Sequence, residues 1–132
     1  MSGKFTLSSQ VEREQLDWGE VGWVANPPTT EAQDITVMEV TLKVGAGHNF
    51  HKHPDQEEVI YVMAGQIEQW LEEEKMTLNP GDSIFIEPDV VHASFNIGDG
   101  MAKLMVVLGP CIGEIGYEVV DVADEEPWKS LR

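Results

Sequence analysis

Single glycines and prolines break the apolar sequence into short runs. The 132 residues include twelve glycines and seven prolines, and no long apolar stretch separates them. Apolar runs of about four to eight residues between turn residues are typical of β-strands, whereas helices need longer runs with a period of about 3.6 residues. About eight such strands, spaced about 8 to 12 residues apart, are typical of a sandwich or barrel. The sequence therefore predicts an all-β protein.

The length allows one compact domain. A chain of 132 residues, 42% of them hydrophobic, buries roughly two-thirds of its unfolded surface without disulfides or structural zinc. The polar stretch 25–34 divides an amino-terminal arm from the body. We expect an arm of residues 1–34 packing on the barrel, a barrel of residues 35–122, and a carboxy-terminal tail of residues 123–132.

The strands expected inside this barrel differ in their patterns. Residues 101–109 are almost continuously apolar, as expected of a strand covered on both faces. Residues 113–122 are expected to form one more strand, and residues 123–132 a short helical or irregular end. The remaining strands are expected at 35–44, 57–65, twice within 66–78, and within 79–96.

The charge and the single cysteine exclude several classes of function. A formal net charge of -16, from 24 acidic and 8 basic side chains, disfavours nucleic acid and anionic membranes as partners, because both need clustered lysine and arginine. The amino terminus lacks the apolar core of a secretory signal, and no run approaches the ~20 apolar residues of a membrane span. Cys111 has no intrachain partner, so we expect a packed structural thiol and a reducing, cytoplasmic setting.

Three of the four histidines and a pair of glutamates lie in the short stretch 48–58. On a strand His51 and His53 point to the same side. Glu58 shares a strand face with Ile60 and Val62, and an ionised carboxylate in an apolar interior costs several kcal/mol without a partner. The stretch is therefore either a polar segment whose histidines are hydrogen-bonded within the protein, or a metal site.

His92, near the start of another strand, is able to reach the same cavity in a closed sheet. Three imidazole nitrogens and one carboxylate oxygen suit one divalent transition metal: iron, manganese, zinc, nickel or copper. Glu57 competes with Glu58 for the carboxylate position, and strand parity leaves the choice open because Val59 and Tyr61 are apolar too.

At these residues the chain resembles single-domain members of the cupin superfamily. The first motif of that family is a glycine, five residues, His-x-His, three or four residues, glutamate, six residues and glycine. The chain matches every position of it, with Gly45, His51, His53, Glu58 and Gly65. The six-residue spacing to Gly65 favours Glu58 over Glu57.

The second motif of the family matches in part. Gly81, His92 and Asn96 stand at the expected spacing, but Glu87 replaces a proline and Asp89 replaces a glycine. These departures concern the shape of the loop and leave the histidine in place.

The resemblance implies a double-stranded β-helix, or jelly-roll barrel, with an amino-terminal arm. It also implies that His51, His53, Glu58 and His92 bind one metal and leave coordination positions open. Residues that could line the same pocket are Gln69, Ser94 and His48. The four tryptophans are expected to plug the barrel ends or a dimer interface.

Similar cupins include dioxygenases, isomerases and decarboxylases, and also proteins that only bind a metal or small molecule. No basic residue is expected to face the ligands, which favours a neutral or weakly acidic organic substrate. We therefore expect a metal-dependent enzyme of the oxygenase, isomerase or lyase type, with dioxygenase-like chemistry among the options. The alternative is a non-catalytic binding or sensing module. The resemblance and the apolar arm also predict a homodimer.

Overall fold

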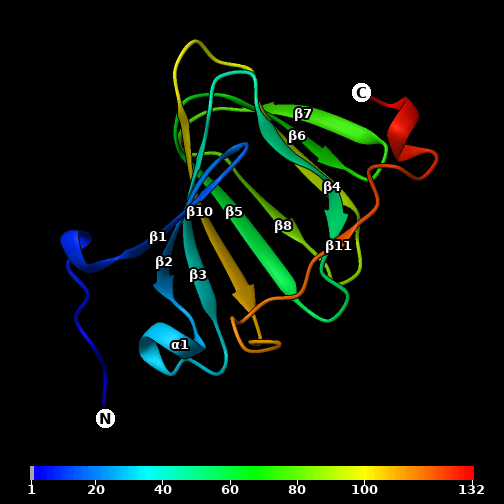
Figure 1. Ribbon diagram of the computed structural model, residues 1–132. Helices are drawn as coiled ribbons and strands as arrows, with labels where there is room; N and C mark the ends of the chain where they lie inside the picture. Colours follow the sequence, from blue (N-terminus) through cyan, green and yellow to red (C-terminus); the bar gives the residue numbers. More distant parts are fainter. Residues whose placement is uncertain (1) are drawn as a thin grey trace.

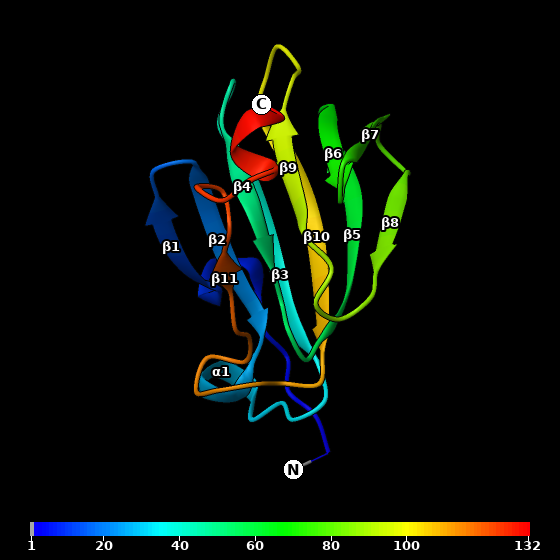
Figure 2. The same cartoon turned by 90° about the vertical axis from the view of Figure 1, so that its right-hand side faces the viewer.

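The computed structural model describes residues 2–132, which form two antiparallel β-sheets that face each other (Figures 1 and 2). Sheet A has the order β1 (Glu12–Leu16), β2 (Gly19–Ala25), β3 (Thr36–Leu42), β10 (Ala102–Gly109), β5 (Glu57–Ala64) and β8 (Ser83–Ile86). Sheet B has the order β11 (Val120–Asp121), β4 (Gly47–Lys52), β9 (His92–Asn96), β6 (Ile67–Leu71) and β7 (Glu74–Leu78). The all-β jelly-roll prediction is confirmed.

The main core lies between the two sheets. Alternate residues of β5 face it: Glu58, Ile60 and Val62 are buried, as expected from the sequence, while Val59 and Tyr61 point outward. Burial of these apolar side chains is what holds the sheets together. The other buried members of this cluster include Leu42, Ile67, Leu104, Val106 and Leu108.

A second apolar cluster lies on the outer face of sheet B. Phe50, Trp70 and Phe95 alternate with side chains that face the interior, so they point away from sheet A. The carboxy-terminal tail covers them, with Trp128 in the short 3-10 helix Trp128–Ser130 packed on Phe50 at a ring-centroid distance of 5.7 Å. The tail thus replaces solvent over this face, as Figure 2 shows for its helix in front of β4 and β9.

The sequence predicts that the strand at 101–109 is covered on both faces, but the structure covers only one. β10 lies between β3 and β5, and its residues alternate between buried and half-buried positions. Met101 is exposed. The expectation of cover on both faces is therefore wrong, because only the inward side chains of β10 meet the opposing sheet.

The prediction of a strand at 113–122 is also wrong for most of that range. Only Val120–Asp121 pairs with β4, and residues 110–119 form a loop instead. Gly116 has a φ of 101°, outside the range of a strand. Three buried polar side chains hold this loop: Asn26 donates to Ile115 O, Thr36 donates to Gly116 O, and Gln56 donates to Gly116 O.

The segment 1–34 supplies two strands of sheet A. β1 pairs with β2, and β2 pairs with β3 from Gly19 to Ala25 with a register shift between Trp23 and Ala25. The helix α1 (Pro27–Thr30) follows β2, and a 3-10 helix, Ser8–Gln10, precedes β1. Among residues 2–132, no helix is both long and apolar enough to cross a membrane.

We expect Ile67→Ala to lower the free energy of unfolding by about 2 to 5 kcal/mol, because it removes a fully buried side chain and leaves a cavity between the sheets. Urea denaturation followed by tryptophan fluorescence measures this. Met76→Ala on the neighbouring strand β7, where the side chain is exposed, should change the same quantity by less than about 0.5 kcal/mol. Equal losses in the two variants would contradict the assigned core.

Candidate metal centre

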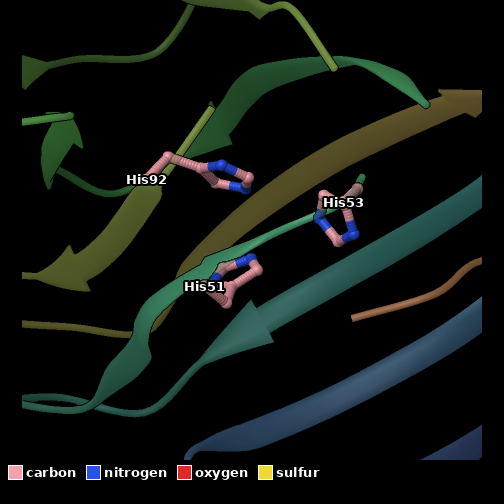
Figure 3. Close-up of side chains that lie close together, drawn as sticks. All are labelled: His51, His53 and His92. Carbon is pink, nitrogen blue, oxygen red and sulfur yellow. The ribbon is translucent and has the colours of Figure 1, made fainter. Parts of the chain in front are cut away.

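Three histidines, His51, His53 and His92, meet in the interior between the sheets (Figure 3), and Glu58 lies beside them. His51 lies on β4 opposite His92 on β9, and His53 follows β4 directly. One ring nitrogen from each of these three histidines lies within 4.8 Å of the others. Glu58 comes from the opposite sheet, and its Oε1 lies 2.8 Å from His92 Nε2 and 3.4 Å from His53 Nε2.

Each of these imidazoles is held by a backbone carbonyl. The Nδ1 atoms of His51, His53 and His92 lie 2.6, 2.7 and 3.0 Å from the oxygens of Asn49, Glu118 and Val90. A carbonyl oxygen only accepts hydrogen bonds, so each Nδ1 carries its proton. In the neutral ring the lone pair is then on Nε2, the atom that would bind a metal.

Three buried atoms of this cluster have no hydrogen-bond partner in the described chain: His53 Nε2, His92 Nε2 and Glu58 Oε1. They lie close together, but in the neutral rings Nε2 carries no proton to donate to the carboxylate. Buried polar atoms left without a partner are costly. A single cation among them would satisfy all three at once, so these residues fit a bound divalent metal.

The direction of the pKa shifts indicates that the Glu58 carboxyl is ionised among the histidines. Burial alone would raise the pKa of Glu58, but its contacts with His53 and His92 outweigh burial and hold that pKa below its usual range. Burial and the neighbouring His48 and His92 lower the pKa of His51 well below its usual value. Burial would lower the pKa of His53 too, but the contact with Glu58 outweighs it and raises that pKa. The centre therefore combines an ionised carboxylate with at least one neutral imidazole.

The loop before His92 accommodates the departures from the second motif. Asp89, which stands where the motif has glycine, has a φ of 66°, a left-handed conformation that aspartate adopts more readily than most residues. Its N–H donates to His53 O over 2.9 Å, and its carboxylate lies 3.0 Å from Lys52 Nζ. The substituted loop thus still docks against the backbone of His53.

A cavity of about 40 Å³ is lined by His51, His53 and Glu58, whereas His92 is not among its lining residues. His48, which lines it, stacks between the rings of Trp18 and His51, with centroid distances of 5.3 and 3.6 Å. Tyr117 lines another side, and its ring lies 5.8 Å from that of His53. The rest of the lining is mainly apolar: Val21, Met38, Val40, Leu42, Ile60, Leu104 and Val106, with Ser94.

The other residues expected at the pocket occupy different positions. Ser94 lines the cavity, and its hydroxyl donates to Gln69 Oε1 over 2.6 Å. Gln69 is buried but does not line this cavity; its amide donates to Trp70 O. Glu57 is exposed on the outer face of sheet A, whereas Glu58 is buried beside the histidines.

Sequence reasoning missed Gln56, Trp18 and Tyr117. The Gln56 amide donates to Pro110 O over 2.6 Å and to Gly116 O over 2.9 Å, and its Oε1 accepts from Glu118 N over 3.2 Å. Gln56 therefore fixes the loop whose Glu118 carbonyl holds His53. A buried amide directly before Glu57 carries no signal in the sequence, because its partners lie more than fifty residues away.

The comparisons with known proteins concern the same part of the chain. The family model described as Cupin domain matches residues 38–108. Protein SchB of Streptomyces halstedii is 31% identical over 109 residues, which cover 81% of this chain and 79% of that protein. Quercetin 2,3-dioxygenase of Bacillus subtilis is 31% identical over 91 residues, which cover 69% of this chain but 26% of that enzyme. The structure of KdgF from Halomonas sp. superimposes with a TM-score of 0.76 at 21% identity, covering 86% of this chain and 98% of that one.

We expect Gln56→Leu to weaken metal binding about 10- to 100-fold, since it releases the loop that carries the carbonyl partner of His53. Competition with a chromophoric zinc chelator measures this affinity, and circular dichroism verifies the fold. Gln66→Leu is the matched control, because the Gln66 amide bonds only Asn79 at the surface. Unchanged affinity in Gln56→Leu, or the same loss in the control, would argue against this role of Gln56.

Proposed function

The chain belongs to the cupin family, and from that premise we propose that it is a metal-dependent enzyme acting on a small neutral or weakly acidic organic molecule. One observation carries the proposal: buried, unpartnered nitrogen and oxygen atoms of His53, His92 and Glu58 face one another beside an apolar cavity. A folded protein retains such a cluster at a cost in stability, and cation binding offsets that cost.

In this proposal His51, His53, Glu58 and His92 hold one divalent transition metal, which is iron, manganese, zinc, nickel or copper. Such an ion, when bound, acts as a Lewis acid, lowers the pKa of a bound water, or supports chemistry with dioxygen if it is redox-active. The carbonyls of Asn49, Val90 and Glu118 orient the imidazoles for that task. The rings of Trp18 and Tyr117, which line the cavity, would limit the access of bulk water to the metal.

The cavity lining supports the substrate class. None of the eight basic side chains is among the residues that line the cavity, so apart from the proposed metal a phosphorylated or multiply charged molecule would find no lysine or arginine to pair with. A volume of about 40 Å³ admits about three waters or a small polar group, since one water needs roughly 10–15 Å³. We infer that one small donor group of the substrate enters, while the remainder lies against the aromatic rings at the wall.

Among the reaction types, an oxygenase has support from the relative named quercetin 2,3-dioxygenase, and isomerase or lyase types follow if dioxygen is not consumed. The small cavity volume favours a second candidate, a non-catalytic module that binds or senses a metal or small molecule. We also propose a cytoplasmic setting, which the single Cys111 supports.

Elemental analysis of protein purified without a metal-affinity column tests the proposal first. We expect about one equivalent of iron, manganese, zinc, nickel or copper per chain, with oxygen uptake on a panel of neutral and weakly acidic enols and phenols if the reaction is an oxygenation. If the protein contains metal and binds a compound of the panel tightly but turns over none of them, the binding module is favoured. Protein that contains none of these metals, after growth with all of them, would overturn both the metal-dependent enzyme and the metal-binding module.

We expect His92→Ala, and likewise His51→Ala, to lose bound metal and any activity while the barrel stays folded. Apolar burial between the sheets holds the fold, so the free energy of unfolding should fall by no more than the metal linkage, about 4 kcal/mol at a thousandfold excess of metal over Kd. Metal analysis and thermal unfolding measure the two effects.

His48→Ala is the control, because His48 stacks on His51 without belonging to the proposed ligands. It should retain metal. A variant set in which His48→Ala loses metal and His92→Ala keeps it would show that the ligand assignment is wrong.

A further inference from the structure

A second pocket lies at the open edge between the two sheets. β7 is the last strand of sheet B and β8 is the last strand of sheet A, and both stand on the right-hand side of Figure 2. The pocket at these strands, called the edge pocket below, has a volume of about 170 Å³, and none of the four proposed metal ligands lines it. Its principal side chains come from β6, β7 and β8: Gln69, Leu71, Glu74, Met76, Leu78 and Ile84.

The size and the walls of the edge pocket suit one small apolar ring. An apolar protein cavity of about 150 Å³ holds a molecule of benzene, and the edge pocket has about 170 Å³. Leu78 is buried, and Leu71 and Ile84 are half-buried. A ring that displaces water from these three side chains gains the free energy of apolar burial.

Gln69 is the polar side chain of the edge pocket that lies deepest in the protein, with 3% of its surface exposed. Its Oε1 accepts from the Ser94 hydroxyl over 2.6 Å, and its amide nitrogen donates to Trp70 O over 3.0 Å. An amide nitrogen carries two hydrogens, and within residues 2–132 this nitrogen has Trp70 O as its acceptor. The second N–H is therefore available to an oxygen atom of a ligand, and pairing it offsets the cost of burying it.

The charged groups around the edge pocket favour a neutral ligand. Lys75 Nζ lies 5.3 Å from the ring centroid of Trp70 and 3.9 Å from Glu68 Oε2. Trp70 belongs to the cluster on the outer face of sheet B, so the lysine charge is held outside the pocket. Glu74 lies opposite Leu71 on the inner side of the β6–β7 pair. An anion would meet the Glu74 carboxylate there without a cation to pair with.

Gln69 and Ser94 separate the edge pocket from the cavity beside the metal centre. Ser94 lines that cavity, whereas Gln69 lines the edge pocket. The strand register places the two residues opposite each other on β9 and β6, and the hydrogen bond between them closes the boundary. The edge pocket is therefore a compartment of its own.

We propose that the edge pocket is a second small-molecule site, which takes a neutral compound of about the size of benzene with one carbonyl or hydroxyl oxygen. The ring packs on Leu71, Leu78 and Ile84, and the oxygen accepts from the second N–H of Gln69. The proposal does not rest on the metal centre or on its reaction.

NMR titration of the full chain with two matched compounds tests the proposal. Cyclohexanone carries the acceptor oxygen, and methylenecyclohexane has the same shape without it. We expect cyclohexanone to bind with a dissociation constant of about 1 mM. The shifts should saturate at the Gln69 side-chain amide and at the methyl groups of Leu71, Leu78 and Ile84, with intermolecular nuclear Overhauser effects from the ring to the same methyl groups.

Gln69→Leu should weaken cyclohexanone binding about fivefold, the equivalent of one hydrogen bond, and leave methylenecyclohexane binding unchanged. Gln66→Leu is the matched control, since Gln66 bonds Asn79 and does not line the edge pocket. It should bind both compounds like wild type.

Three outcomes would overturn the proposal: no saturable shifts in wild type, Overhauser effects to Val40 or Leu104 of the other cavity instead, or equal affinity for cyclohexanone in Gln69→Leu and wild type. The wild-type titration decides the question even if Gln69→Leu does not fold. Metal content is measured separately, so failure of the edge pocket and failure of the metal centre are distinguishable.

Discussion

The structure depends on how four ionisable side chains are kept inside an apolar barrel. Each histidine satisfies its Nδ1 with a carbonyl of the barrel, which leaves Nε2 and the Glu58 carboxylate turned toward one another. Carbonyl partners fix both the ring orientation and the site of the lone pair. The interior thus holds an ionised carboxylate among imidazoles, an arrangement that a cation completes better than any rearrangement of hydrogen bonds.

Both sheets and one irregular loop are needed to build this arrangement. Sheet B supplies His51 and His92 from paired strands, and sheet A supplies Glu58 from across the core. The loop 110–119 supplies the Glu118 carbonyl that holds His53, and it adds Tyr117 to the cavity wall. Gln56 ties the loop to the barrel. In the proposed metal centre, metal binding would be coupled to the position of this loop through the His53 ring.

Periodicity and motif spacing in the sequence were enough to predict the fold class, most of the strands and the histidines and glutamate of the candidate site. Strand parity left Glu57 and Glu58 open, and the motif spacing to Gly65 favoured Glu58, whose face Ile60 and Val62 share; turn residues marked most of the strands. Periodicity did not reveal the loop at 113–122, because the apolar residues there resemble a strand while Gln56, Thr36 and Asn26 hold the backbone from distant positions. The uncovered outer side of β10 was missed for a related reason, since an apolar run does not say whether a second layer exists. The sequence predicts that Trp18 plugs a barrel end or a dimer interface, whereas the structure stacks its ring on His48, thirty positions away in the sequence.

The most direct test of the metal centre is long-range ¹H–¹⁵N NMR of the imidazole rings during titration with zinc, a diamagnetic ion. The account predicts that the Nε2 signals of His51, His53 and His92 shift together and saturate at one equivalent, while each Nδ1 keeps its proton and the ring of His48 stays unligated. Zinc-dependent shifts confined to other residues, or a ring bound through Nδ1, would contradict it.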